Sequence, residues 1–352
     1  LCTSVQRSRA ALSDRVLCRI VHHAGGLAAT AAKATQKLQA FDDAGIGVGS
    51  GGRAGPAGRL LCGLRTELCA RLAGPGEGDG VWPAGDLCLV AHSYAHAPGG
   101  TADRPLFEAL RGRLGEVALL RLSPGELAGL ANAFSKLTQA AEHGHIEFFD
   151  KLGRQLAAAG EAPGLRSACV ALSAFAQASI RHEPLFAALG DHLPAWLHAR
   201  DCDMRQLAML AHAHVRVGLT QSSLLPLLWE RARRLAPSSD AHGVSVMLFA
   251  VTKASAAGTT AGAVLLAELG RRLLGLLGSD GAVEPTTVAV TSYALVRGGC
   301  ASAVEPALWR ALAEAAELGL GSLSLSEAAN IADAFAQLPR TAPEAALEAV
   351  GE

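Results

Sequence analysis

Aromatic residues are scarce in this chain: 9 Phe, 4 Trp and 2 Tyr make up only 4% of its 352 residues. Strands favour aromatic and β-branched side chains, so a core built on a β-sheet is not expected. Half of the residues are nevertheless hydrophobic, and this apolar mass is mainly Ala and Leu, two of the strongest helix formers. The proportions therefore predict an all-α fold.

Several signatures of other protein classes are also missing. No run of about 20 uncharged apolar residues occurs, so no membrane span is expected. The eight cysteines form no CxxC pair, and most of them are expected to be small buried hydrophobes in a reducing compartment. The glycine-rich stretch 45–52 lacks the GK[ST] of a phosphate loop and follows no strand. We expect no enzyme activity, cofactor, metal or small-molecule substrate.

The net charge is only −1, but it is unevenly distributed. Residues 1–41 hold six basic side chains against one acid, whereas residues 266–352 hold five against eleven. A basic arm can steer a protein toward phosphate, although a neutral chain is not expected to bind polyanions non-specifically with high affinity. The chain begins at Leu1, so we expect a processed product or a fragment, and its Arg-bearing, acid-poor start resembles an organellar transit segment.

What the chain has in quantity is one repeated helical motif. Leu-Ala-Asn-Ala-Phe-Ser-Lys-Leu at 130–137 returns in variant form at 90–97, 172–178, 210–217, 248–254, 290–296 and 331–338. Its aromatic position, here called the slot, is taken by Tyr94, Phe134, Phe175, His214, Val251, Tyr293 and Phe335. The successive spacings are 40, 41, 39, 37, 42 and 42 residues. Periods of this length predict an α-solenoid of about seven to eight helix-turn-helix repeats of roughly 37–42 residues.

Each repeat is expected to consist of an A helix that carries the motif and a B helix that follows it. The predicted B helices span 59–73, 105–118, 147–160, 184–197, 223–236, 263–277 and 306–319. Further helices are expected at 13–24 and 27–43, and glycine-rich loops at 44–58 and 74–85. The predicted organisation is a basic capping segment (1–26), a divergent first repeat (27–84), regular repeats (85–338) and a truncated or capping end (339–352).

The motif of the A helices, together with B helices of the Pro-Leu-Phe-x-x-Leu type, resembles octotricopeptide and heptatricopeptide repeats. These repeats occur in algae and alveolates and are related to the repeat region of FAST-kinase-like organellar proteins. The resemblance covers 85–338 clearly and 27–73 loosely, and it departs from the pattern at His214 and Val251. It implies an α-solenoid that works on organellar RNA, as a maturation or stability factor or as a subunit of a mitochondrial ribosome.

Two positions, two residues before and two after the slot, lie on one helix face and form the candidate site. The pairs are His92/His96, Asn132/Lys136, Ser173/Gln177, His212/Arg216, Phe249/Lys253, Thr291/Leu295 and Asp333/Gln337. Five of the seven pairs are polar at both positions, and hydrogen-bonding side chains on helical repeats can read unstacked bases. The alternative is the solvated face that every amphipathic helix has.

Other polar clusters have simpler explanations. Arg231, Arg233 and Arg234 lie at the end of a B helix, where they complement the negative helix terminus or contact phosphate. His92 and His96 have the spacing of a helical metal pair, but no third ligand is evident. The histidines of the His143-Gly-His145 segment are expected at the surface.

Three functions are open, of which the two that involve RNA are implied by the resemblance and the third, a scaffold, is favoured by the neutral charge and the Ala and Leu content. The first is an organellar RNA-binding protein, most simply an rRNA-binding subunit of a mitochondrial ribosome, whose partners are RNA and neighbouring proteins. The alternatives are a protein scaffold or assembly subunit of another organellar complex, and an RNA maturation or stability factor. We expect the mitochondrial matrix, with the plastid as the alternative location.

Overall fold

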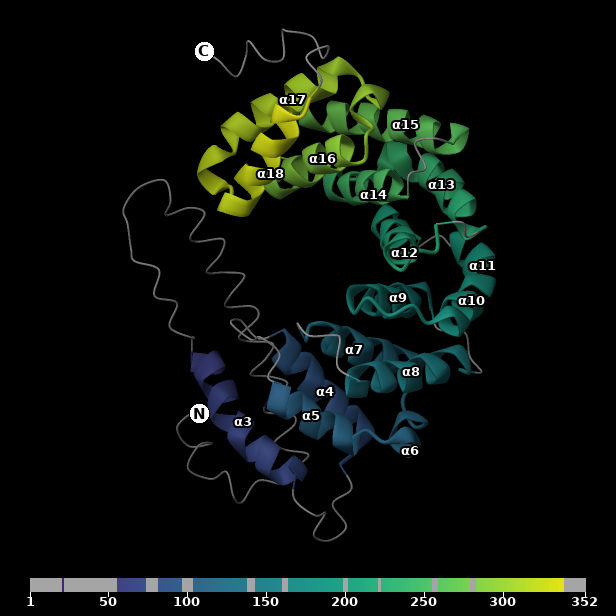
Figure 1. Ribbon diagram of the computed structural model, residues 1–352, viewed down its shortest axis with the longest axis vertical. Coiled ribbons are helices and arrows are strands. Elements are labelled where there is room, and N and C mark those ends of the chain that lie inside the picture. Colours follow the sequence, from purple (N-terminus) through teal and green to yellow (C-terminus); the bar gives the residue numbers. More distant parts are fainter. Residues whose placement is uncertain are drawn as a thin grey trace. The chain divides into compact units, whose positions relative to one another are not determined.

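The computed structural model describes residues 21, 56–73, 82–96, 104–137, 143–159, 164–198, 202–220, 223–254, 259–278 and 283–338. Within these ranges every regular element is an α-helix or a short 3-10 helix, so the all-α prediction is confirmed (Figure 1). The predicted helices 13–24 and 27–43, the glycine-rich stretch up to 55 and the tail from 339 lie outside the described residues, except for the buried residue Val21. The chain divides into two compact units, Leu1–Leu189 and Gly190–Glu352.

In the first unit, three A helices pack side by side in chain order. They are α4 (Ala84–Ala95), α7 (Pro124–Ser135) and α9 (Leu165–Gln177), and α7 contacts both of the others. The B layer contains α3 (Pro56–Ala73), α5 (Arg104–Arg113), α6 (Glu116–Leu119) and α8 (His143–Ala157). Helix α10 (Glu183–Asp191) follows α9. Within this unit each repeat buries its apolar side against the next repeat, as expected for stacked repeats.

The second unit continues the same A-then-B order. Its A helices are α12 (Met204–Arg216), α14 (Ala241–Lys253), α16 (Pro285–Arg297) and α18 (Leu325–Ala336), and each packs on the next. Its B helices α13 (Leu224–Leu235), α15 (Thr260–Leu277) and α17 (Pro306–Leu318) form the second layer, after the short α11 (Leu193–Leu197). The 3-10 turns η2 (Ala236–Ser238), η4 (Ala301–Ala303) and η5 (Leu320–Ser322) connect helices. The solenoid-type repeat arrangement is confirmed.

Capping side chains set the starts of several A helices. The Ser123 hydroxyl accepts from the backbone N–H of Glu126, and the Glu126 carboxylate accepts from the Ser123 N–H. Asp203 with Gln206, and Ser324 with Glu327, form the same reciprocal capping box. Because these bonds satisfy N–H groups that have no partner inside the helix, they define where the helix begins.

Five of the seven predicted slot residues are buried in the interior: Tyr94, Phe134, Phe175, His214 and Val251. Phe134 is 1% exposed, and its ring centre lies 4.9 Å from that of Phe107 and 4.6 Å from that of Phe148. Phe175 is fully buried and contacts Phe149 at 4.9 Å. Phe335, on the last described A helix, is half-buried and contacts Trp309 at 5.8 Å. The small residues around the slot thus let helices approach while a large side chain fills the gap.

In one repeat, that of α16, the slot residue is not the one that the motif predicted. In α7, α9, α12 and α14, buried residues lie seven, six, four, three and one residue before the slot. In α16 this pattern fits only if Leu295 is the slot residue, because Leu295 and Thr291 are both 0% exposed whereas Tyr293 is half-buried. The prediction that placed Tyr293 in the slot, and Thr291 and Leu295 on the polar face, is therefore wrong.

Two predicted B helices are also interrupted. The helix expected over 105–118 ends at Arg113 and resumes at Glu116, on either side of Gly115, a residue that weakens helices. The helix expected over 184–197 breaks at His192. Pro194 follows that break, and it lacks the N–H that a continuous helix would need there. In the part of the chain that the structure describes, no helix combines the length and apolarity needed to cross a membrane.

Candidate functional site

With the corrected register, the positions two residues before and two after the slot lie on the helix face opposite the buried slot residue. At about 100° per residue these two positions are only about 40° apart, so their side chains stack along the axis. We call these residues the A-helix row. It contains His92/His96, Asn132/Lys136, Ser173/Gln177, His212/Arg216, Phe249/Lys253, Tyr293/Arg297 and Asp333/Gln337, all exposed or half-buried.

In the first unit the row is polar. The rings of His92 and His96 lie 4.2 Å apart. Lys136 is half-buried, and burial lowers the pKa of its ammonium group. The hydroxyl of Ser135, beside the row on α7, donates to the Oε1 atom of Gln177 at 3.1 Å, which links α7 to α9. The neighbouring helices therefore present their row residues as one surface.

In the second unit the row combines rings with cations. The ring centres of His212 and Phe249 lie 5.3 Å apart, which joins α12 to α14. Lys253 Nζ lies 5.7 Å from the Phe249 ring centre, and Arg297 Cζ lies 6.0 Å from that of Tyr293. Cations at this range are attracted by the negative face of an aromatic ring.

His212 lies close to two positively charged side chains. Burial lowers the pKa of its imidazole, and the charges of Arg216 and Lys253 lower it further. The neighbouring cations thus favour the neutral imidazole. Positive charge from two successive A helices is therefore concentrated at one place on the row.

Tyr293 and Arg297 are row residues that the motif prediction missed. It missed them because Tyr293 matched the aromatic letter of the motif. The apolar spacing of α16 held the correct signal, since Val288 and Leu295 are seven residues apart and both buried. Phe249 was recognised as a row position but not as a candidate site residue.

The three arginines of the predicted basic run lie apart from the row, on the B helix α13. Arg233 and Arg234 both pair with Glu230, at 3.1 and 3.0 Å, and Arg233 also approaches Glu268 of α15 at 3.7 Å. Arg231 is half-buried. Arg233 and Arg234 therefore form ion pairs with glutamates of the B layer.

His145 is a second correction. It is 4% exposed and packs against the Phe149 ring at 4.8 Å, so it is a core residue rather than the expected surface histidine. Among the described residues no group of three or more His, Cys, Asp or Glu side chains could hold a metal ion. Burial, followed by the charge of Glu126, raises the pKa of the Cys88 thiol to about 12, which keeps it protonated and unreactive.

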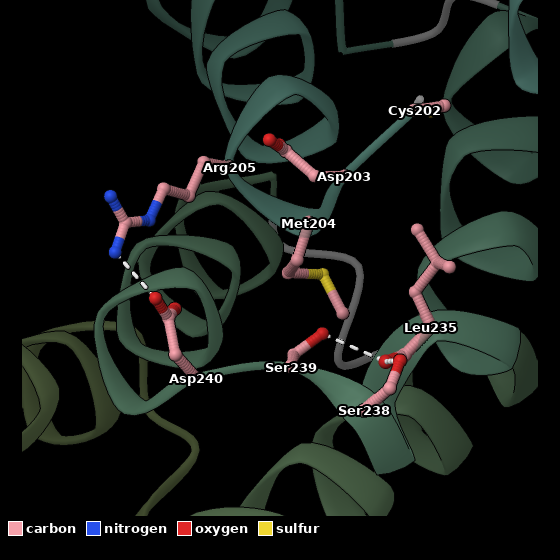
Figure 2. A pocket seen from close by; sticks show the side chains of 8 residues that line it. All are labelled: Cys202, Asp203, Met204, Arg205, Leu235, Ser238, Ser239 and Asp240. Carbon is pink, nitrogen blue, oxygen red and sulfur yellow. Dashed lines mark hydrogen bonds and ion pairs between the residues drawn. The ribbon is translucent and has the colours of Figure 1, made fainter. Parts of the chain in front are cut away.

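A pocket in the second unit lies where the α13–α14 connection meets the start of α12 (Figure 2). Its polar groups have structural roles. Asp203 caps α12, and Asp240 caps α14 and pairs with Arg205. The Ser239 hydroxyl donates to the carbonyl of Leu235 at 2.8 Å. We therefore take this pocket to be a packing feature between helix ends.

Comparisons with known proteins add no identification. No protein-family model matches the chain, and no curated protein matches it. The resemblance to octotricopeptide and heptatricopeptide repeats therefore stays a prediction from the motif, and the A-helix row remains the basis for any functional proposal.

Proposed function

We propose that this protein is an organellar helical-repeat RNA-binding protein, most simply an rRNA-binding subunit of a mitochondrial ribosome. The observation that carries the proposal is the chemistry of the A-helix row. Four repeats place a cation two residues after the slot: Lys136, Arg216, Lys253 and Arg297. These four side chains are exposed or half-buried, whereas the opposite face of each helix is buried in the core.

Electrostatics supports a phosphate backbone as the partner. The protein as a whole is nearly neutral, so a general attraction to polyanions is weak. In the second unit, three successive A helices (α12, α14 and α16) instead hold a cation at the same position, which suits a linear polymer with regularly spaced negative charges. Each phosphate contact adds to the salt dependence of binding, by a slope of about 0.7 for a single strand. Polar residues of the A-helix row, such as Asn132 and Gln177, can form hydrogen bonds with bases.

Charge reversal on the row tests this function. The Lys136→Glu/Arg216→Glu variant should bind a labelled 30-nucleotide rRNA fragment at least about tenfold more weakly at low salt, because two cations become anions. The matched control is Arg271→Glu/Arg310→Glu, which reverses two exposed arginines on the B helices α15 and α17. Circular dichroism should report equal helicity for both variants. Equal RNA affinity of the two double variants would refute the proposal.

A protein scaffold is the second candidate, and one observation favours it. Leu318 and Leu325, around the α17–α18 connection, are each 92% exposed. Exposed apolar side chains that form a contiguous patch often mark protein contacts. A purified chain with a protein-like 260/280 nm absorbance ratio, which captures a defined polypeptide and no RNA, would favour this alternative. An RNA maturation or stability factor would use the same row as a ribosomal subunit.

A further inference from the structure

Three successive A helices of the second unit carry a ring before the slot and a cation after it. The rings are His212, Phe249 and Tyr293, and the cations are Arg216, Lys253 and Arg297. We call this set the ring–cation ladder. It spans α12, α14 and α16, and α14 packs against both of the others.

The placement of Phe249 and Tyr293 differs from that of the Phe and Tyr residues in the other A helices. Tyr94, Phe134 and Phe175 occupy the buried slot of α4, α7 and α9. In α14 and α16 the slot is filled by the aliphatic residues Val251 and Leu295, and the ring stands at the surface instead. Aromatic residues are scarce in this chain, and packing in the core does not explain why positions 249 and 293 hold them.

The rings are partly open to solvent. Phe249 and Tyr293 are half-buried, whereas Lys253 and Arg297 are exposed. Each cation lies near its ring at 5.7 or 6.0 Å. At such exposed sites the cation–ring attraction is weak, so a stacked base can take the ring face while the cation turns to the adjacent phosphate.

Unpaired nucleic acid matches this combination. Successive bases of a single strand stack on aromatic side chains, and basic residues follow its backbone. A duplex keeps its bases stacked inside and offers the ladder only phosphate. A ladder that served only phosphate would need no rings.

We propose that the ring–cation ladder binds an unpaired stretch of RNA, with bases stacked on His212, Phe249 and Tyr293 and phosphates beside the three cations. This inference rests on the proposed RNA-binding function and deepens it by naming the form of the RNA. On α18 the corresponding ring position is Asp333, which hydrogen-bonds Gln337 at 2.6 Å. Its negative charge repels phosphate, so the ladder ends at α16.

The test compares single-stranded and duplex RNA of the same 12-nucleotide sequence by fluorescence anisotropy with the full chain. Phe249→Leu/Tyr293→Leu removes two rings but keeps all three cations. Single-strand affinity should fall by about 25-fold or more, since each stacked base contributes roughly fivefold or more. Duplex affinity and the salt dependence should stay the same. Trp196→Leu, which removes a half-buried ring on α11, is the matched control.

A second measurement needs no variant. A single-stranded probe containing 2-aminopurine should change its emission on binding to the wild-type chain, because the fluorescent base stacks on a ring. Unchanged emission, or equal affinity of wild type and Phe249→Leu/Tyr293→Leu for the single strand, would overturn the ladder while leaving RNA binding intact. If the wild-type chain binds neither form of RNA, the proposed function and the ladder both fail.

Discussion

Lys253 Nζ lies 5.7 Å from the ring centre of Phe249, one helical turn earlier on α14. Arg297 and Tyr293 repeat this relationship on α16 at 6.0 Å. Because α14 and α16 are neighbours, the two pairs form parts of one surface. Each pair is worth about 0.5–1 kcal/mol at an exposed site, too little to explain the fold. The pairs are therefore better understood through what they present to a ligand.

The buried slot histidine should make stability depend on pH. His214 is 2% exposed, its Nδ1 atom lies 2.8 Å from the carbonyl oxygen of Leu210, and burial lowers its pKa from 6.5. Well above pH 6.5 neither the folded nor the unfolded chain binds the proton. Below it the unfolded chain binds the proton first, so the free energy of unfolding falls as the pH drops.

His214→Phe should flatten this dependence between about pH 7 and 5, measured by urea unfolding at each pH. Each unit by which the folded pKa is lowered corresponds to about 1.4 kcal/mol. The exposed residue His198 provides the control, since His198→Phe should leave the pH profile as it is in the wild type. A His214→Phe profile parallel to that of the wild type would contradict the argument.

Slot residues in different repeats should differ in their contribution to stability. Phe175→Ala removes a fully buried ring and should cost about 3–5 kcal/mol in the free energy of unfolding. Phe335→Ala, at the same motif position, should cost much less because that ring is half-buried. Urea denaturation of the two variants tests the difference, and equal losses would show that the slot assignment does not govern packing.

Gly153 permits a close contact between α8 and His182, the residue that precedes α10. A methyl group added at this position would lie 2.7 Å from the His182 ring, and that ring is buried against the ring of Phe175. Gly153→Ala should therefore destabilise the protein by about 1–3 kcal/mol. Gly129 of α7 has nothing within 4 Å of the added carbon, so Gly129→Ala should stabilise by up to about 1 kcal/mol. Thermal unfolding shifts in the same direction would contradict this prediction.

The capping box at the start of α18 can be tested with neighbouring serines. The Ser324 hydroxyl accepts from the Glu327 N–H, and the Glu327 carboxylate accepts from the Ser324 N–H. Ser324→Ala should cost about 1 kcal/mol. Ser326→Ala, at an exposed position two residues later, should cost little. Equal urea midpoints for the two variants would show that the cap does not stabilise α18.

Much of the candidate site could be predicted from the motif alone. The spacing of Phe134, Phe175 and their counterparts identified the A helices, and helix geometry then located His212, Arg216 and Lys253 on the opposite face. Tyr293 and Arg297 could not be found this way. A tyrosine is compatible with either the slot or the outer face. The spacing of Val288 and Leu295 favoured the outer face, and the burial of Leu295 decided the assignment.

The abundance of Ala and Leu and the period near 40 residues determined the helical class and the stacking of repeats, because helix propensity and apolar spacing are local properties of the chain. Tertiary packing decided which side of α16 faces the core and that His145 is buried. It also paired Arg233 and Arg234 with Glu230. These outcomes depend on which neighbouring helix fills each space, and residues of adjacent helices meet only after the repeats have stacked.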